Sequence, residues 1–351
     1  MLDLTQDVRA LTAAIVDIES VSGAEQALAD QVERALAALP HLKVDRSGQT
    51  IVARTELGRG ERVLIAGHLD TVPVAANLPS RVEGDLLYGC GTSDMKAGVA
   101  VALKLAATVP VPNRDVTYVF YDCEEIEADR NGLTRLARDH ADWLTADFAV
   151  LMEPTDGVIE GGCQGTVRAE IVVTGKRAHS ARSWFGVNAI HGIEPVLARL
   201  NAYQERLPVV DGLEYHEGLN AVGVRGGVAG NVIPDECVVT VNYRFAPDLS
   251  IEQAQEHVRE VFDSYEVRFV DAASGARPGL THPVAAAFTA AVGGTPRAKL
   301  GWTDVARFSA LGVPAVNYGP GDPNLAHQQG EYVSLAKIVD SERAMLAWLA
   351  S

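Results

Sequence analysis

Short apolar runs alternate with amphipathic segments through the first half of the chain. The apolar runs occupy residues 62–66, 116–121 and 148–152, and they have the continuous hydrophobicity of strands buried on both faces. Helical periodicity covers residues 4–19 and 24–39, with Ser22 as a plausible N-cap, and a helix rich in Ala, Val and Leu is expected at 96–108. Strands separated by helices predict an α/β fold, with a mixed, largely parallel sheet sandwiched by helices.

The pattern changes near residue 168. The expected order there is a strand at 167–174, a helix at 188–200, antiparallel strands at 219–228 and 236–245, and a helix at 251–265. This order corresponds to a βαββαβ arrangement and predicts an inserted α+β domain. Helix and strand character returns after residue 282, with a strand at 313–318. We therefore expect a first catalytic segment at 1–166, an inserted lid and dimerisation domain at 167–281, and a second catalytic segment at 282–351.

Composition narrows the classes of function. At 351 residues and 47% hydrophobic content, the chain is long enough for two globular domains. Its formal charge of -16 disfavours nucleic acid and anionic membranes as partners, because phosphate groups are bound by clustered Lys and Arg. No signal-peptide pattern or apolar span of about 20 residues is found, so a cytoplasmic location is expected. The four scattered cysteines favour reduced thiols.

Imidazoles and carboxylates stand at the ends of several apolar runs, where ligands of a parallel sheet collect. They are His68, Asp70, Asp94, Glu124, Glu125, Glu153 and His327. Each has an ordinary structural alternative, such as a turn, a helix cap or a solvated surface. Together they offer nitrogen and hard oxygen ligands, a combination suited to zinc, with cobalt or manganese as substitutes.

Two pairs within this set carry further expectations. His68 and Asp70 are two residues apart at a strand end, so both point to one face if the strand continues, and Asp70 can orient the imidazole. Glu124 and Glu125 are adjacent carboxylates directly after a strand. In a metal site, one of these two glutamates binds the ion and the other takes a proton from water.

These residues, in this order, resemble the superfamily of zinc-dependent aminoacylases, acetylornithine deacetylases and glutamate carboxypeptidases. Later motifs are similar to the succinyl-diaminopimelate desuccinylase branch of actinobacterial type. The motifs are Cys-Gln-Gly-Thr at 163–166, Thr-Gly-Lys-Arg-Ala-His-Ser-Ala-Arg-Ser-Trp at 174–184, Gly-Val-Ala-Gly-Asn-Val-Ile-Pro-Asp at 227–235, Asn-Tyr-Arg-Phe-Ala-Pro-Asp at 242–248 and Gly-Trp-Thr-Asp-Val-Ala-Arg-Phe at 301–308. The resemblance implies a zinc-peptidase-like fold.

The resemblance also implies a ligand set for two Zn²⁺ ions per subunit. One ion would be held by His68 and Glu153 and the other by Glu125 and His327, with Asp94 and a water or hydroxide bridging both. Glu124 would act as general base and then as general acid, and Asp70 would orient His68. His179 would stabilise the oxyanion, often from the partner subunit of a dimer. A cis peptide bond is expected after Asp94.

The activity implied by the resemblance is hydrolysis of N-succinyl-LL-2,6-diaminopimelate to LL-2,6-diaminopimelate and succinate, in lysine and cell-wall precursor biosynthesis. A small substrate with several carboxylates calls for Arg and polar donors. Candidates from the motifs are Asn231, Arg244, Thr303 and Arg307. Some bacterial desuccinylases carry Arg-Arg-Gly-Ser at the position of residues 163–166, so a carboxylate-binding Arg is missing here. Arg177 or Arg182 is a candidate replacement.

Two alternatives remain open. The first is a sister amidohydrolase on the same metal core, such as an acetylornithine deacetylase, an aminoacylase or a dipeptidase. The second is a non-catalytic metal-binding protein, which the complete ligand set with Glu124 disfavours. A homodimer formed through the inserted domain is expected from the family likeness and from the edge strand that such a domain must cover. Succinyl or acetyl preference, metal occupancy and lid closure are not determined by the sequence.

Overall fold

Two units divide the chain in the computed structural model, which describes residues 2–350. Unit 1 contains the residues up to Gly161, then Pro278–Arg297, and the residues from Arg307 onward. Unit 2 contains Gly162–Arg277 and Ala298–Ala306. The functional division expected at 166/167 and 281/282 stays a prediction.

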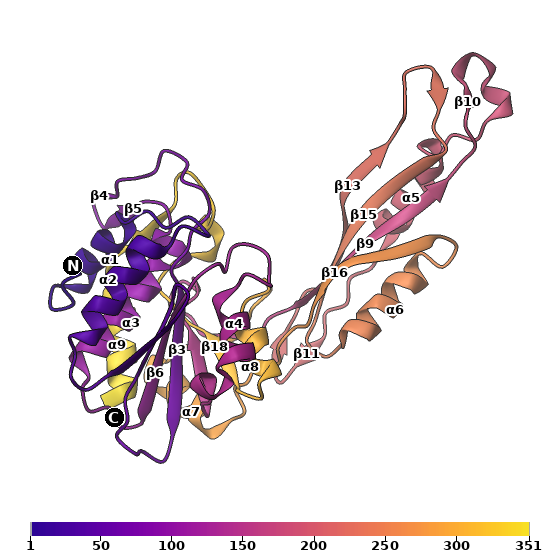
Figure 1. The fold of residues 1–351 in the computed structure, drawn as a ribbon. Coiled ribbons are helices and arrows are strands. Elements are labelled where there is room, and N and C mark those ends of the chain that lie inside the picture. The colour runs from indigo at the N-terminus through magenta and orange to yellow at the C-terminus, as the bar shows by residue number, and fades with distance from the viewer. Residues whose placement is uncertain (1, 351) are drawn as a thin grey trace. The chain divides into compact units, whose positions relative to one another are not determined.

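A mixed sheet forms the centre of unit 1 (Figure 1). Within the described residues its order is β1 (Lys43–Ser47), β2 (Thr50–Arg54), β6 (Asp115–Tyr121), β3 (Arg62–His68), β7 (Phe148–Leu151), β18 (Ala315–Asn317), β8 (Glu160–Gly161) and β17 (Arg297–Ala298). The central strands β6, β3, β7 and β18 run parallel to one another, whereas β2 pairs antiparallel with β6 and β8 pairs antiparallel with β18. The predicted fold class is therefore confirmed.

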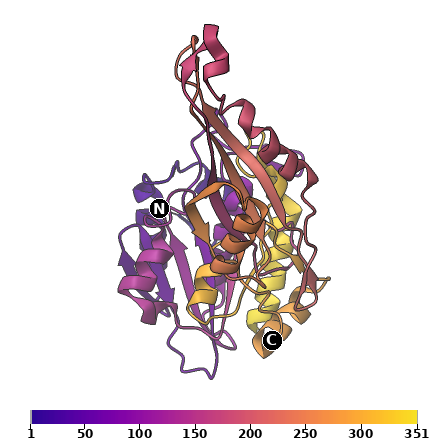
Figure 2. The same cartoon turned by 90° about the vertical axis from the view of Figure 1, so that its right-hand side faces the viewer.

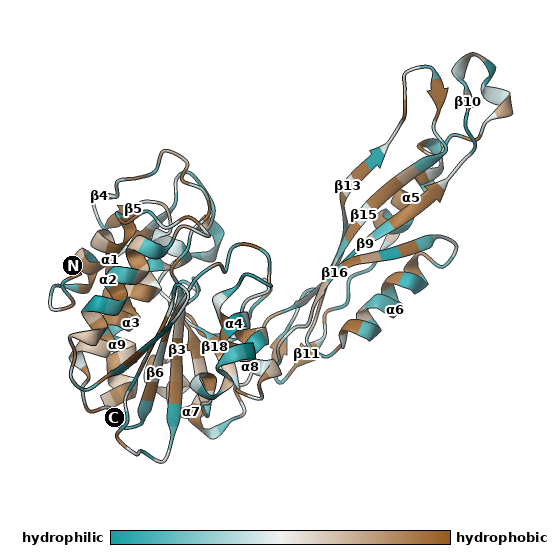
Figure 3. Cartoon of the chain, in the orientation of Figure 1, coloured by the Kyte–Doolittle hydropathy of each residue, from teal (hydrophilic) through white to brown (hydrophobic). Residues whose placement is uncertain are grey.

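Helices cover this sheet because its central strands are apolar on both faces. Figure 1 shows α1 (Val8–Val16), α2 (Gln26–Ala37), α3 (Ala97–Thr108) and α9 (Leu335–Ala350) on one side of the strands and α4 (Gly132–Asp139) on the other. Helix α3 is apolar nearly all round and almost completely buried, and β3 and β6 are hydrophobic along most of their length (Figure 3). Helix α7 (Pro283–Val292) packs against α9.

The N-cap expected at Ser22 is wrong. Helix α2 begins at Gln26, with Glu25 at its N-cap position. The Ala24 N–H donates to the Val21 carbonyl at 2.7 Å, so residues 21–24 form a turn before the helix begins. The Ser22 hydroxyl instead donates to the Asp70 carboxylate at 2.7 Å.

Unit 2 has the predicted βαββαβ order. Its main elements are β9 (Gly165–Thr174), α5 (Glu194–Ala202), β13 (Gly218–Gly226), β15 (Glu236–Phe245), α6 (Ile251–Val261) and β16 (Glu266–Ala273). The sheet is antiparallel in the order β13-β15-β9-β16, so β13 and β16 are its edges. Apolar side chains of β9 and β15 form one core with residues of α5 and α6.

Short elements complete both units. One end of the unit 2 sheet carries β10 (Ala178–His179), β14 (Val232–Ile233) and the turn η3 (Ser180–Phe185), as Figures 1 and 2 show. The others are β4 (Arg81–Glu83), β5 (Leu86–Tyr88), η1 (Thr92–Lys96), η2 (Ala141–Leu144), η4 (His191–Ile193), β11 (Val209–Val210), β12 (Leu213–Glu214), α8 (Val305–Ala310), η5 (Pro323–Leu325) and β19 (Tyr332–Ser334). None of the helices between residues 2 and 350 is both long and apolar enough to span a membrane.

Candidate active site

Imidazoles and carboxylates meet at the carboxyl end of the central strands of unit 1. His68 Nε2 lies 3.1 Å from Asp94 Oδ1, and His327 Nε2 lies 2.8 Å from Glu125 Oε1. His327 Nε2 is also 3.4 Å from Asp94 Oδ2. Ligand atoms of His68, Asp94 and Glu125 all lie within 4.8 Å of one another, as the ligands of one metal ion do. The sequence-predicted residues of this group are thus brought together by contacts between distant parts of the chain.

Strand register explains this meeting point. His68 is the last residue of β3 and is opposite Tyr121, the last residue of the parallel strand β6. The segments that follow both strands therefore leave the sheet at the same edge, which brings Glu125 near His68. Asp94 follows the glycine-containing turn before α3, and Gly91 there has φ +80°, with room so limited that a Cβ would lie 2.6 Å from Thr71. The peptide bond between Asp94 and Met95 is cis, as the resemblance implied.

Asp70 organises the segment that carries both glutamates. Its Oδ1 accepts from the Glu124 N–H and its Oδ2 from the Glu125 N–H, each at 3.0 Å. His68 Nδ1 lies 3.0 Å from the Asp70 backbone oxygen and 3.5 Å from its Oδ1. Asp70 therefore contacts the imidazole mainly through its carbonyl group, while its buried carboxylate holds the Glu124 and Glu125 backbone.

The charges in this cluster shift the pKa values of its members. Burial opposes protonation of His68, but the hydrogen bond with Asp94 and the charges of Asp70 and Asp94 raise its pKa well above the ordinary value. Hydrogen bonds with Asp94 and Glu125 raise the pKa of His327 to about 10. Burial disfavours the Asp94 carboxylate, yet its bonds with His327 and His68 leave its pKa lowered. The cluster therefore concentrates negative charge around two imidazoles, a donor set that fits a divalent cation such as zinc.

Two members of the predicted set have other positions. Glu153 is buried just beyond the end of β7, the strand that pairs with β3. It does not belong to the group formed by His68, Asp94 and Glu125, whose ligand atoms lie within 4.8 Å of one another. Glu124 lies beside its neighbour Glu125, and its negative charge contributes to the raised pKa of His68. The role of Glu124 as the base of this site stays a prediction.

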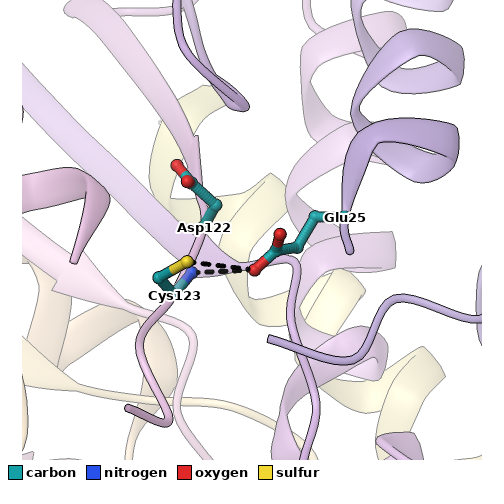
Figure 4. Close-up of side chains that lie close together, drawn as sticks. All are labelled: Glu25, Asp122 and Cys123. Atoms are coloured by element: carbon teal, nitrogen blue, oxygen red, sulfur yellow. Dashed lines mark hydrogen bonds between the residues drawn. The ribbon is translucent and has the colours of Figure 1, made fainter. Parts of the chain in front are cut away.

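A second group of potential ligands consists of Glu25, Asp122 and Cys123 (Figure 4). Glu25 Oε1 accepts from the Cys123 N–H at 3.1 Å and from its thiol at 3.4 Å. Asp122 pairs with Arg135 at 2.6 Å. Burial and the Glu25 charge raise the pKa of Cys123 to about 12, which keeps this sulfur a thiol. The polar groups of Glu25, Asp122 and Cys123 thus have partners within the protein. Their contacts support the backbone turn that precedes Glu124.

Glu331 is a feature of the site that sequence reasoning missed. Its carboxylate accepts backbone hydrogen bonds from the segment that carries Asp94. Burial raises the pKa of Glu331 to about 7, although these backbone donors favour its charged form. The one available signal was its position four residues after His327, and no local pattern distinguishes it from a surface glutamate.

The remaining predicted residues are divided between the units. In unit 2, His179 pairs with Val232 at the end of the sheet, and the Asn231 carbonyl accepts from the Ser180 N–H at 2.9 Å. Arg244 is near the other end of β15, opposite Thr166. Thr303, also in unit 2, accepts from the Cys163 thiol through its carbonyl, whereas Arg307 belongs to α8 and unit 1.

The predicted state of the cysteines is confirmed, because all four are free and buried. Of the suggested replacements for the missing Arg, Arg177 is already paired with Asp235 at 2.8 Å, and Arg182 lies in η3. Gln164 donates from its side chain to the His216 carbonyl at 2.5 Å.

A mixed α/β sheet with imidazoles and carboxylates gathered at its strand ends defines a metal-dependent hydrolase site of the zinc-peptidase type. The chain belongs to peptidase family M20/M25/M40, whose model matches residues 64–351. This membership confirms the superfamily assignment made from the motifs.

Two relatives match the chain over nearly its full length. A Mycobacterium tuberculosis protein provisionally named succinyl-diaminopimelate desuccinylase DapE is 59% identical, over 96% of this chain and 96% of the relative. The succinyl-diaminopimelate desuccinylase of Corynebacterium glutamicum is 46% identical, over 99% and 98% of the two chains.

Solved structures share the fold at lower sequence identity. A tripeptidase from Staphylococcus aureus has a TM-score of 0.81 at 19% identity, covering 99% of this chain and 98% of that one. An M20 family metallo-carboxypeptidase from Sulfolobus solfataricus has a TM-score of 0.76 at 16% identity, covering 98% of both chains. At these identities the likeness concerns the fold alone.

Proposed function

We propose that this chain is a metal-dependent amidohydrolase that cleaves N-succinyl-LL-2,6-diaminopimelate to LL-2,6-diaminopimelate and succinate. The observation that carries the proposal is the cluster of His68, Asp94, Glu125 and His327 beside Glu124. The names of relatives at 59% and 46% identity support the choice of substrate. A place in lysine and cell-wall precursor biosynthesis follows from that substrate, and the cytoplasmic location stays a prediction.

The proposed cofactor is two Zn²⁺ ions per subunit, with Co²⁺ or Mn²⁺ as substitutes. His68 and Glu153 would hold one ion, and Glu125 and His327 would hold the other, with Asp94 shared by both. Imidazole nitrogen and carboxylate oxygen are the donors that zinc accepts in such sites. Bound metal would polarise the substrate amide and increase the acidity of water.

Glu124 is the proposed general base and acid. A water oxygen adds to the carbonyl carbon of the succinyl amide, and the Glu124 carboxylate takes the proton that this water loses. Glu124 then gives that proton to the amine nitrogen as the C–N bond breaks. Asp70 supports this role because it fixes the Glu124 N–H at 3.0 Å. His179 would donate a hydrogen bond to the developing oxyanion.

The substrate carboxylates would be bound by Arg244, with Asn231, Thr303 and Arg307 as further contacts. Arg244 is the strongest of these candidates because a guanidinium group matches a carboxylate in both charge and geometry. Its Nε donates to Asn242 Oδ1 at 3.1 Å, which orients the side chain on β15. The Thr303 carbonyl accepts from the thiol of Cys163, which is the first residue of the segment where desuccinylases of another type carry Arg.

Distances within unit 2 support the proposal that a second copy of the chain contributes residues to each active site. His179 and Asn231 are near the start of β15, whereas Arg244 is near its end. Eight residue steps separate Glu236 from Arg244, which corresponds to roughly 26 Å of strand. One small substrate therefore cannot contact both groups of a single chain, and we propose that His179 and Asn231 come from the partner.

The edge strand β13 is the proposed dimer contact. Val222 and Val224 on this strand are 59% and 55% exposed, and Val228 just beyond it is 56% exposed. An exposed apolar edge strand with unpaired backbone groups is a template for pairing with another chain. A symmetric pair of β13 strands would cover these side chains and join two copies.

The test is hydrolysis of N-succinyl-LL-diaminopimelate and N-acetylornithine by zinc-loaded and chelator-stripped protein. Zinc-dependent preference for the succinyl substrate supports the proposal. Preference for acetylornithine would favour the acetylornithine deacetylase alternative on the same metal core. Metal binding without hydrolysis of either substrate, or of dipeptides and other N-acylated amino acids, would contradict an amidohydrolase and favour a metal-binding protein.

A further inference from the structure

Glu331 makes a concentrated set of contacts with the turn that precedes α3. Its Oε1 accepts from the Ser93 N–H at 2.7 Å and from the Asp94 N–H at 3.0 Å. Its Oε2 accepts from the Gly91 N–H at 3.0 Å. Glu331 is only 2% exposed, so these bonds are shielded from water. Both carboxylate oxygens are therefore committed to the backbone that carries Asp94.

The backbone of Glu331 makes two further hydrogen bonds, one to the start of the same turn and one to the loop after His327. Its carbonyl accepts from the Gly89 N–H at 3.1 Å, so one residue holds the turn at both ends. The Glu331 N–H in turn donates to the Gln328 carbonyl at 3.1 Å, directly after His327. His327 itself has φ +64°, a backbone conformation that a non-glycine residue keeps only when its surroundings hold it.

A carboxylate is the side chain that this arrangement requires. Converging backbone N–H groups form a nest for an anion, and an ionised carboxylate accepts several hydrogen bonds through its two oxygens. A glutamine side chain offers one acceptor oxygen, and its amide nitrogen would meet a backbone N–H as donor against donor. Replacing Glu331 with Gln therefore leaves at least one buried N–H group unsatisfied.

We infer that Glu331 is a positioning residue for the metal site, because it fixes Asp94 and the His327 loop relative to each other. The inference rests on the proposed function, in which Asp94 and His327 bind metal. Glu331 acts on the site through backbone hydrogen bonds to the Asp94 segment and to the loop after His327. Metal binding would therefore require Glu331 in addition to the residues that bind the metal directly.

The experiment measures Zn²⁺ binding to chelator-stripped Glu331→Gln protein by calorimetry, together with the visible spectrum of the Co²⁺-substituted form. We expect Zn²⁺ affinity to fall about 10- to 100-fold, which is typical when a group supporting metal ligands is removed. The cobalt spectrum should change because the ligand directions change. With saturating metal, kcat should fall more than KM rises.

The matched control is Glu217→Gln, in unit 2. Glu217 is also fully buried, and it accepts from the Tyr243 hydroxyl at 2.7 Å and the Ala246 N–H at 2.9 Å. This variant should lower the melting temperature while leaving Zn²⁺ affinity and the cobalt spectrum unchanged. An equal loss of affinity in both variants would overturn the inference, since the effect would then follow from any buried glutamate.

The outcomes separate this inference from the proposed function. Wild-type affinity and an unchanged cobalt spectrum in Glu331→Gln would overturn the positioning role and leave the proposed function intact. Wild-type protein that binds neither Zn²⁺ nor Co²⁺ would instead overturn the proposed function. If Glu331→Gln does not fold, Glu331→Asp tests the same point, because its shorter side chain keeps the charge but withdraws the oxygens. Unchanged metal affinity in that variant would also contradict the inference.

Discussion

The carboxylate of Asp70 accepts a hydrogen bond from the backbone N–H of Glu124, at 3.0 Å. The same carboxylate accepts from the Glu125 N–H, so one buried side chain fixes both the proposed base and the proposed metal ligand. Asp70 follows β3 and the two glutamates follow β6. Two adjacent strand ends are thereby joined at the point where the chemistry is expected.

Replacing Asp70 with Asn should weaken metal binding about 10- to 100-fold, because the amide side chain cannot accept from both glutamate N–H groups. Calorimetric titration of chelator-stripped protein with Zn²⁺ measures this change. Ser22→Ala is the control, since it removes only the hydroxyl that donates to Asp70 at 2.7 Å. We expect a smaller loss for Ser22→Ala, and equal affinities in wild type and Asp70→Asn would refute the role of Asp70.

Replacing Glu124 with Gln should lower kcat about 10²- to 10⁴-fold and leave Zn²⁺ content unchanged. The amide group is nearly isosteric with the carboxylate but cannot take the proton from water. Steady-state hydrolysis and metal analysis of the same preparation provide both readouts. The control is Glu127→Gln on the same segment, where the side chain is 73% exposed and turnover should stay at the wild-type level. Turnover in Glu124→Gln equal to that of this control would show that another group is the base.

Several elements could be predicted because their signal is local. The apolar runs that became β3, β6 and β7 are visible as continuous hydrophobicity, and His68, Asp70, Glu124, Glu125 and Glu153 lie at or shortly after the ends of these strands. Strands β1 and β2 were missed because Lys43–Ser47 is mostly polar and the whole hairpin is short. The βαββαβ order of unit 2 emerged from alternating patterns within single strands.

Hydrogen bonds between residues far apart in the sequence could not be predicted from these local hydrophobic patterns. Glu331 and Gly91 are separated by 240 positions in the sequence. No hydrophobic or helical periodicity indicates that the side chain of this glutamate binds the backbone of the turn at Gly91. Ser22 matched the composition of an N-cap, yet the fold uses its hydroxyl for Asp70. Supporting groups of this kind depend on tertiary packing, whereas several of the proposed ligands lie at or shortly after the ends of apolar strands that can be recognised in the sequence.

A charge on strand β13 should separate the proposed dimer. Val224→Glu would place a carboxylate on a 55% exposed position of this edge strand, and paired strands would bring two such charges together. Light scattering should report a dimer for wild type and a monomer for the variant. Activity should fall in the monomer, because His179 and Asn231 are proposed to act on the partner's site.

Val270→Glu is the matched control for this experiment. Val270 is 50% exposed on β16, the opposite edge of the same sheet, so the variant adds the same charge without touching β13. It should remain dimeric and active. A monomeric wild type that is fully active would contradict both the dimer and the role of His179 in the partner site.

Arg244→Ala should raise KM for N-succinyl-LL-diaminopimelate at least tenfold, while KM for N-acetylornithine changes less. The reason is that the acetyl compound lacks the succinyl carboxylate that Arg244 is proposed to bind. Michaelis constants for both substrates with zinc-loaded protein provide the comparison. Arg268→Ala removes an exposed arginine of the same sheet, paired with Glu266 at 2.7 Å, and should change neither constant. Equal increases for both substrates would remove Arg244 from the succinyl subsite.

Asp115 should make the stability of unit 1 depend on pH. Burial disfavours its carboxylate, but hydrogen bonds from the Leu57 N–H (2.8 Å), the Thr55 hydroxyl (2.7 Å) and the Arg59 N–H (2.9 Å) lower its pKa below the ordinary 3.8. The folded state therefore binds this proton less readily than the unfolded state. The stabilisation is present above pH 3.8 and is lost as the pH falls through the lower folded-state pKa.

Asp115→Asn isolates this contribution, because the amide does not titrate and offers one acceptor oxygen in place of two. Urea unfolding at pH 7 should give a free energy of unfolding about 2 kcal/mol lower than wild type. The difference should shrink as both proteins are measured at successively lower pH below 3.8. Asp129→Asn, at an exposed position, should change the free energy of unfolding by less than about 0.5 kcal/mol at every pH. A difference between Asp115→Asn and wild type that stays constant down to the acid transition would mean that lost packing, rather than the ionised carboxylate, accounts for the destabilisation.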